Sequence, residues 1–146
     1  GRGRRAGAVL ARAGSVADTA RRDPAGPSPE VPLPQILVDH SAELDFDTSV
    51  LAEEVHRAIT EVIDTAVPDC KTVFRPAARY VVGDGTAGEA VVLVEIKILA
   101  GRSVEQRAEL TARVLAVVES CVTVPAAIGV EVTELDRATY RFVHHR

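Results

Sequence analysis

The chain has 146 residues, of which 47% are hydrophobic and 26% are charged, enough apolar material for the core of one domain. It contains three Phe, two Tyr and no Trp, so we expect that core to be aliphatic. No apolar run reaches the roughly 18 residues that a membrane helix needs, and we therefore expect no membrane partner.

The net charge of −4 is unevenly distributed along the chain. Residues 1–33 hold six arginines against three acidic residues, a net charge of +3. Residues 34–146 hold 11 basic against 18 acidic residues, a net charge of −7. An acidic domain repels polyphosphate, so we expect no nucleic-acid partner. Small anionic substrates are compatible with this charge if a few cations gather in a pocket.

Residues 1–33 are rich in Gly, Ala, Arg, Ser and Pro, which predicts a disordered extension in front of a folded domain of residues 34–146. Because the sequence contains no methionine, we also consider two other origins of this extension. It is either a segment added for expression or the result of reading the gene upstream of its true start codon. A native start near Leu33 would leave Pro34 as the first residue. A start at Val31 would instead leave Pro32, two positions away.

Two cysteines, Cys70 and Cys121, are present. Their number and spacing match neither a disulfide framework nor a metal site, so we expect small buried apolar residues and no bound metal. A reducing cytoplasm is the expected compartment.

The first half of the domain predicts a strand, a helix and a broken extended region. Ile36–His40 alternates between two faces, as a half-buried strand does. Asp47 is the expected N-cap of a helix that ends at Pro68. The apolar stripe of this helix consists of Leu51, Val55, Ile59, Val62/Ile63 and Ala66. Residues 72–74 and 79–82 are expected to be extended, with Pro76 interrupting the ladder between them.

The second half of the domain begins after a turn at Gly83-Asp84-Gly85. Ala90–Leu99 is almost continuously apolar, which predicts a central strand. Ser103-Val104-Glu105-Gln106 is a capping box, followed by a helix with an apolar stripe. Gly129–Leu135 alternates as a last strand, and we expect residues 136–146 to form a short hairpin or arm.

The predicted elements form two strand–helix–strand units. Right-handed crossovers then give an α+β fold, with a four-stranded mixed sheet and both helices on one face. We expect the other face of the sheet to be apolar and uncovered by this chain, which predicts an oligomer assembled through the sheet.

Few residues carry a recognisable chemistry. The chain has no phosphate-binding loop and no Ser/His/Asp arrangement. We expect His40 to be a structural hydrogen bonder and His56 a surface residue, with His144 and His145 in a solvated tail. Arg102 follows the strongest strand and precedes a helix N-terminus, so it is a candidate carboxylate ligand. The alternative is a surface arginine paired with Glu105 or Glu109.

Four segments between Pro34 and Tyr140 carry a resemblance to a known family: PQILVDHS, the GDG turn, IKILAGRSVEQR and VEVTELD. Together they resemble the 5-carboxymethyl-2-hydroxymuconate isomerases, a branch of the tautomerase superfamily. The resemblance implies a tautomerase-like fold of two β-α-β units, assembly as a homotrimer and active sites between subunits. It also implies a cofactor-free proton transfer in the breakdown of aromatic compounds.

In this family the amino-terminal proline is the base, which places Pro34 in that role by resemblance, and Arg102 then binds a substrate carboxylate. A low-dielectric pocket and nearby cations lower the pKa of such an amine. Lys71 stands where many relatives have an arginine, and it keeps the charge without the two-pronged grip. Arg75 or Arg79 is expected to compensate.

As written, Pro34 follows Leu33, so its nitrogen is a tertiary amide without usable basicity. The isomerase interpretation therefore depends on Pro34 being the first residue of the mature chain. Two alternatives stay open: another tautomerase of the superfamily, of the phenylpyruvate type, and a non-catalytic trimeric binding or scaffold protein.

Overall fold

Two consecutive β-α-β units make up residues 33–146, the part of the chain that the computed structural model describes. The predicted extension, residues 1–33, lies outside this part except for Leu33. The first unit consists of β1 (Gln35–Ser41), α1 (Thr48–Val62), the 3-10 helix η1 (Val67–Asp69) and β2 (Lys71–Ala77). The second consists of β3 (Ala90–Leu99), α2 (Val104–Cys121) and β4 (Ala126–Leu135).

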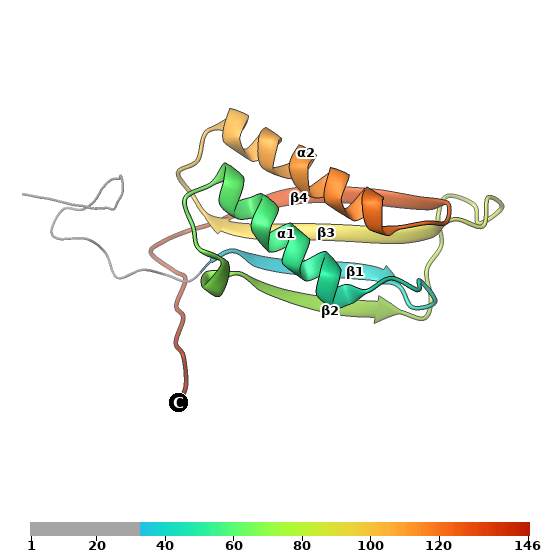
Figure 1. Cartoon of the computed structure of the whole chain (residues 1–146), viewed down its shortest axis with the longest axis horizontal. Helices are drawn as coiled ribbons and strands as arrows, with labels where there is room; N and C mark the ends of the chain where they lie inside the picture. The colour runs from blue at the N-terminus through green and yellow to red at the C-terminus, as the bar shows by residue number, and fades with distance from the viewer. Residues whose placement is uncertain (1–32) are drawn as a thin grey trace, which may run out of the picture. The chain divides into compact units, whose positions relative to one another are not determined.

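The strands form one mixed sheet in the order β2-β1-β3-β4. Within each unit the two strands are parallel, and the units meet where β1 runs antiparallel to β3. Both helices lie on the same face of the sheet (Figure 1), with α1 against α2. The predicted fold class is therefore confirmed.

An aliphatic core fills the space between the sheet and the helices, as the scarcity of aromatic residues predicts. Alternate strand residues point into it because successive side chains of a strand face opposite ways. Its fully buried members come from both units: Ile36, Val38, Leu51, Val55, Ile59, Val92, Ile96, Ile98, Leu110, Val114 and Val118. Each such side chain contributes about 1.5–3 kcal/mol through the hydrophobic effect.

Both predicted helix starts are confirmed. The Asp47 carboxylate accepts hydrogen bonds from the backbone N–H groups of Ser49 (3.0 Å) and Val50 (3.1 Å). At the start of α2, Ser103 Oγ accepts from the Gln106 N–H at 3.1 Å. Gln106 Oε1 in turn accepts from the Ser103 N–H at 3.3 Å. This reciprocal pair fixes where the chain turns from β3 into α2.

The end of α1 differs from the prediction. The helix stops at Val62, and Ile63 is already extended, with φ −122° and ψ 158°. Ala66 therefore does not continue the apolar stripe but precedes η1, which contains Pro68. The helix ends early because the following residues turn back to contact the chain before β1, through Thr65.

The prediction of a broken extended region is wrong as well. β2 runs unbroken from Lys71 to Ala77 through Pro76, which lies opposite His40. This proline is tolerated because β2 is an edge strand, where one side of the ladder needs no donor. The expected strand over residues 79–82 does not form, since the chain has left the sheet there. The Gly83-Asp84-Gly85 turn is confirmed, with positive φ at both glycines.

The ends of the second unit and two histidines need smaller corrections. β4 begins at Ala126, three residues before the predicted start. Residues 136–146 form no strand, so the hairpin alternative is excluded and the arm remains. His40 is buried beside the Ser41 carbonyl, as predicted. His56 is half-buried and hydrogen-bonds the Thr72 hydroxyl at 2.7 Å, so its assignment to the surface is wrong.

The face of the sheet that carries no helix, called the open face below, is mixed in character and not simply apolar as predicted. Val73 and Leu93 are 51% and 53% exposed there. Asp39 and Arg75 lie side by side on the same face in a two-pronged ion pair, with N–O distances of 2.9 and 2.8 Å. Within residues 33–146 no helix combines the length and apolarity needed to cross a membrane.

Candidate active site

The predicted base lies at the end of the sheet where β1 and β2 begin and β3 and β4 finish, called the Pro34 end below. Pro34 is almost completely buried there. Its carbonyl accepts a hydrogen bond from the Lys71 N–H at 3.1 Å, which holds it in register with β2. The position and the burial of Pro34 are thus set by the pairing of β1 with the edge strand β2.

A second contact holds the residue before Pro34. The Leu33 carbonyl accepts a hydrogen bond from the Thr65 hydroxyl at 2.8 Å. That carbonyl oxygen is two covalent bonds from the Pro34 nitrogen, so Thr65 lies beside this nitrogen. The early end of α1, which the stripe of apolar residues did not predict, brings Thr65 here.

Arg102 reaches the same end from the loop between β3 and α2. Gly101, with φ 133°, turns the backbone sharply before it. The Arg102 guanidinium makes a long hydrogen bond of 3.5 Å to the carbonyl of Asp64, the neighbour of Thr65. This chain of contacts brings a cation close to Pro34.

The electrostatic surroundings of Arg102 favour an anionic ligand. Burial lowers the pKa of Arg102 first, and the nearby Arg137 lowers it further, while Asp64 acts in the opposite direction. An arginine stays charged despite such a shift. A bound anion would therefore offset both the cost of burying the Arg102 guanidinium and its repulsion by Arg137. The predicted alternative partner Glu109 instead pairs with Arg113 at 3.8 Å.

Lys71 begins β2 directly opposite Gln35. Its ammonium donates to the Asp69 carbonyl at 2.7 Å and lies 4.7 Å from the centre of the Phe142 ring. Burial lowers the pKa of Lys71, and the neighbouring Asp69 and Cys70 oppose this shift. Lys71 is thus a partly desolvated cation at the Pro34 end.

Lys97 is a cation that the sequence interpretation missed. On the open face, the row of strand residues nearest to Pro34 is called the first row below. In it, Gln35 of β1 lies between Lys71 on β2 and Lys97 on β3. Neighbouring strands are about 4.8 Å apart, so the two lysines flank Gln35. The alternation of β3 could have placed Lys97 on this face, but its closeness to Pro34 depends on the antiparallel register of β1 and β3.

Arg75 and Arg79 are not brought to the Pro34 end of the same chain. Arg75 lies four residues further along β2 than Lys71, about 13 Å away at the usual rise of a strand, and is engaged by Asp39. Hydrogen bonding to Asp39 raises the pKa of Arg75. Arg79 follows the far end of β2.

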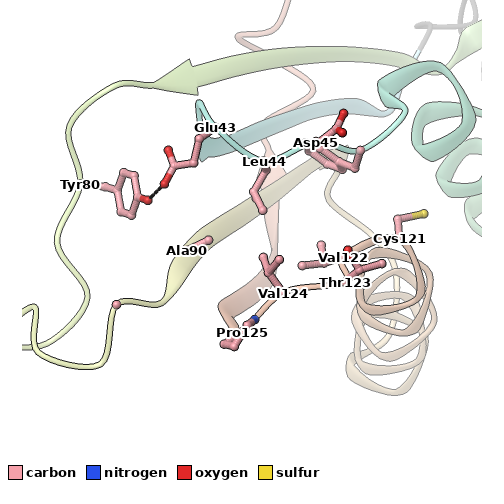
Figure 2. A pocket seen from close by; sticks show the side chains of 12 residues that line it. Glu43, Leu44, Asp45, Tyr80, Ala90, Cys121, Val122, Thr123, Val124 and Pro125 are labelled. Atoms are coloured by element: carbon pink, nitrogen blue, oxygen red, sulfur yellow. Dashed lines mark hydrogen bonds between the residues drawn. The ribbon is translucent and has the colours of Figure 1, made fainter.

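A cavity of about 230 Å³ lies at the opposite end of the sheet (Figure 2). It is bordered by the β1–α1 turn, the loop before β3 and the segment after α2. Tyr80 donates a hydrogen bond to the Glu43 carboxylate across it, and Asp45 adds a second acidic side chain. Since no lysine or arginine of residues 33–146 lines this cavity, the described lining does not suit a carboxylate substrate.

Metal ligands do not converge on either end of the described domain. Residues 33–146 contain no group of three or more His, Cys, Asp or Glu side chains placed to hold a metal ion. Cys70 is buried with its thiol toward the Ala66 carbonyl, and burial raises the pKa of this thiol. Both cysteines are free thiols, and Cys121 is half-buried, so the prediction of a buried residue is confirmed for Cys70 only.

No family model and no curated sequence matches the chain. Solved structures match its fold at low sequence identity. A 5-carboxymethyl-2-hydroxymuconate isomerase from Deinococcus radiodurans R1 has a TM-score of 0.67 at 17% identity, over 77% of this chain and 90% of that one. A malonate semialdehyde decarboxylase inhibited by 3-bromopropiolate has a TM-score of 0.60 at 18% identity, over 77% and 91%.

A third similar structure is a fused 4-OT symmetric trimer, with a TM-score of 0.61 at 18% identity over 71% of this chain and 87% of that one. The described domain therefore has the tautomerase-like fold, and the resemblance found in the sequence is confirmed at the level of fold. The similar structures include both isomerases and a decarboxylase.

Proposed function

We propose that this chain is a tautomerase that isomerises an unsaturated 2-hydroxy carboxylate from the breakdown of aromatic compounds, with Pro34 as its base. The observation that carries the proposal is that Lys71, Lys97 and Arg102 all lie at the end of the sheet that holds the buried Pro34, in a domain whose net charge is −7. Cations concentrated at one end of an acidic domain fit a substrate with carboxylates at that end.

The proposed reaction moves one proton within the substrate. The Pro34 amine removes a proton from the hydroxyl or carbon of the dienol, and returns it at another carbon of the conjugated system, giving the 2-oxo isomer. Burial and the nearby cations disfavour the protonated amine, which keeps the base neutral near pH 7. Arg102 holds a carboxylate in a two-pronged grip, and Lys71 stabilises a second anionic group.

This chemistry requires a free amine, so the active species begins at Pro34. In the chain with Leu33 in front, the same nitrogen belongs to an amide. That observation favours the second candidate, a non-catalytic trimeric binding protein, for any form of the chain that keeps the preceding residues.

Assembly as a homotrimer through the open face is part of the proposal. It is supported by the exposed Val73 and Leu93 side chains on that face and by the trimeric form of one similar structure. In such an assembly Arg75 or Arg79 of one subunit would serve the site of another, which is the remaining role for these two residues.

The test compares two forms of the chain, one with residues 1–33 and one that begins at Pro34. Each is given a 2-hydroxymuconate and, separately, an enol of the phenylpyruvate type, and the ultraviolet absorbance of the enol is followed. We expect the form beginning at Pro34 to be faster by on the order of 10² or more, because a positioned base contributes that much. Faster reaction of the phenylpyruvate enol would favour that type of tautomerase.

A charge-matched pair of variants tests the binding role. Arg102→Lys is expected to raise KM about tenfold, since lysine keeps the charge and loses the planar grip. Arg57→Lys, on the exposed surface of α1, is the control and should leave KM unchanged. If both forms of the chain lack activity on every enol, the enzyme proposal is wrong and the binding protein is favoured.

A further inference from the structure

The segment after β4 folds back onto the Pro34 end. It starts where the Leu135 carbonyl accepts from the Ala100 N–H at 3.1 Å, beside the Arg102 loop. The Asp136 carbonyl then accepts from the N–H groups of Thr139 and Tyr140, both at 3.1 Å. This turn sends the following residues back across the sheet.

Tyr140 is anchored to the residue that follows Pro34. Gln35 Nε2 donates a hydrogen bond to the Tyr140 hydroxyl oxygen at 2.6 Å. Tyr140 is half-buried, whereas the next residue, Arg141, is exposed. The hydroxyl thus sits on the first row of the open face, where Gln35 lies between Lys71 and Lys97.

The direction of this hydrogen bond leaves the Tyr140 hydrogen without an acceptor among residues 33–146. Because Gln35 donates, the hydroxyl oxygen is the acceptor, and its own hydrogen is available for a second hydrogen bond. Among residues 33–146 no acceptor for this hydrogen is recorded. Burial raises the pKa of Tyr140, so the hydroxyl keeps its proton at neutral pH.

Phe142 fixes the same segment two residues later. Its ring lies 4.7 Å from the Lys71 ammonium, a cation–π contact. Phe142 is half-buried between the exposed Arg141 and Val143, as expected for an extended segment with one face packed. Two anchors, on neighbouring strands, therefore hold the Tyr140 hydroxyl in a defined position.

We propose that Tyr140 donates its free hydrogen bond to the oxygen that becomes negative as the substrate is converted to its dienolate, with Gln35 as the positioning residue. This inference rests on the proposed function. The hydroxyl bonds to Gln35, whose neighbours on the adjacent strands are Lys71 and Lys97, and two cationic residues beside it favour a negative oxygen there. A preorganised donor at a developing oxyanion accelerates the reaction without a cost of reorganisation.

The chain offers a matched control for this role, because it contains one other tyrosine. Tyr80 donates to Glu43 at the opposite end of the sheet. Tyr140→Phe and Tyr80→Phe remove the same atom, one at each end. Neither removal creates a large void, and unfolding midpoints of both variants report whether the fold is kept.

The kinetic test uses the form of the chain that begins at Pro34. Tyr140→Phe is expected to lower kcat by on the order of 10² while KM changes less than about threefold, because the donor acts mainly on the developing charge. Gln35→Leu should lower kcat in the same direction by a smaller factor. Tyr80→Phe should change neither constant.

A binding test needs no turnover. Oxalate carries a carboxylate and an adjacent anionic oxygen, as the dienolate does, and it cannot react. Calorimetry should show that Tyr140→Phe weakens oxalate binding about tenfold or more, as expected for a hydrogen bond to a charged group. Acetate, which lacks the second oxygen pair, should bind the wild-type chain and Tyr140→Phe equally.

The outcomes separate the two proposals. An active wild-type chain with an equally active Tyr140→Phe variant overturns this inference alone, as does unchanged oxalate binding. An inactive wild-type chain overturns the proposed function and the kinetic role of Tyr140 with it. A loss of activity in Tyr140→Phe that is matched by Tyr80→Phe or by a lost unfolding transition assigns Tyr140 to the fold.

Discussion

The capping box at the start of α2 sets the position of Arg102, so its removal is expected to affect both stability and the candidate site. Ser103→Ala removes the acceptor for the Gln106 N–H and leaves that donor at the exposed end of the helix, where water replaces the lost partner. We therefore expect a loss of about 1 kcal/mol in the free energy of unfolding. For a domain of this size, the thermal midpoint falls by about 3–6 °C.

A double-mutant cycle shows whether the two hydrogen bonds act as a unit. Gln106→Ala removes the bond to the Ser103 N–H, and Ser103→Ala/Gln106→Ala removes both. Since each side chain holds the other's backbone, we expect the double variant to lose at least about 0.5 kcal/mol less than the sum of the single losses. Unfolding in urea at one protein concentration measures all three, because the proposed assembly would make stability depend on concentration.

Ser49→Ala, in the first turn of α1, is the control for this cycle. The Ser49 side chain makes no recorded hydrogen bond among residues 33–146, and alanine is a good helix former, so its midpoint should not fall. Additive losses in the cycle, or an unchanged midpoint for Ser103→Ala, would contradict the reciprocal cap. A fall in affinity for carboxylate substrates is expected to accompany Ser103→Ala, because Arg102 precedes the cap directly.

Three further predictions concern burial. Burial lowers the pKa of Lys71, so this residue loses its charge at a lower pH than an ordinary lysine does. KM should therefore rise on the alkaline side of the pH–rate profile. Lys71→Arg, which stays charged, should remove that rise. Burial also lowers the pKa of His56, so as the pH falls from about 7 the unfolded chain takes up the proton first and stability is lost. His56→Gln should flatten this acid slope in urea midpoints measured between pH 5 and 7. Leu110→Ala, at a fully buried position of α2, should cost about 3 kcal/mol, while Leu115→Ala, 38% exposed on the same helix, should cost less than about 1 kcal/mol in the same unfolding assay.

The elements that sequence alone predicts well are those whose signals are local. The apolar run of β3 and the capping box of α2 each depend on neighbouring residues only, and both are confirmed. The fold class follows from the order of such elements, because handedness restricts how two strand–helix–strand units can close into one sheet. The fold class therefore follows from local signals, without individual tertiary contacts.

The incorrect predictions all depend on strand order or on contacts distant in sequence. Pro76 was expected to break a strand because the edge position of β2 is known only once the sheet is assembled. Ala66 fits the helical stripe but is taken out of it by the loop that carries Thr65 to Leu33. Similarly, the mixed open face arises from the pairing of charged strand residues such as Asp39 and Arg75 across two strands.

The residues of the candidate site also differ in whether local sequence signals predict them. Arg102 is predicted from a strand end and a helix cap, both local signals. Lys97 and Tyr140 are not, since their closeness to Pro34 requires the antiparallel register and the turn at Asp136. Tyr140 and Gln35 are 105 positions apart, and only the fold joins them.

Shortening the chain to Pro34, on which the enzyme proposal depends, is expected to preserve the domain. The β1–β2 register at this end is held by the Pro34 carbonyl and the Lys71 N–H, and both survive the truncation. Among residues 33–146, the truncation removes the Leu33 side chain, 7% exposed, and its bond to Thr65, which together contribute about 2–4 kcal/mol. Urea unfolding of chains that begin at Leu33 and at Pro34 measures this difference. A chain that fails to unfold cooperatively when it begins at Pro34 would show that the preceding residues belong to the fold, and a buried amide would then replace the proposed base.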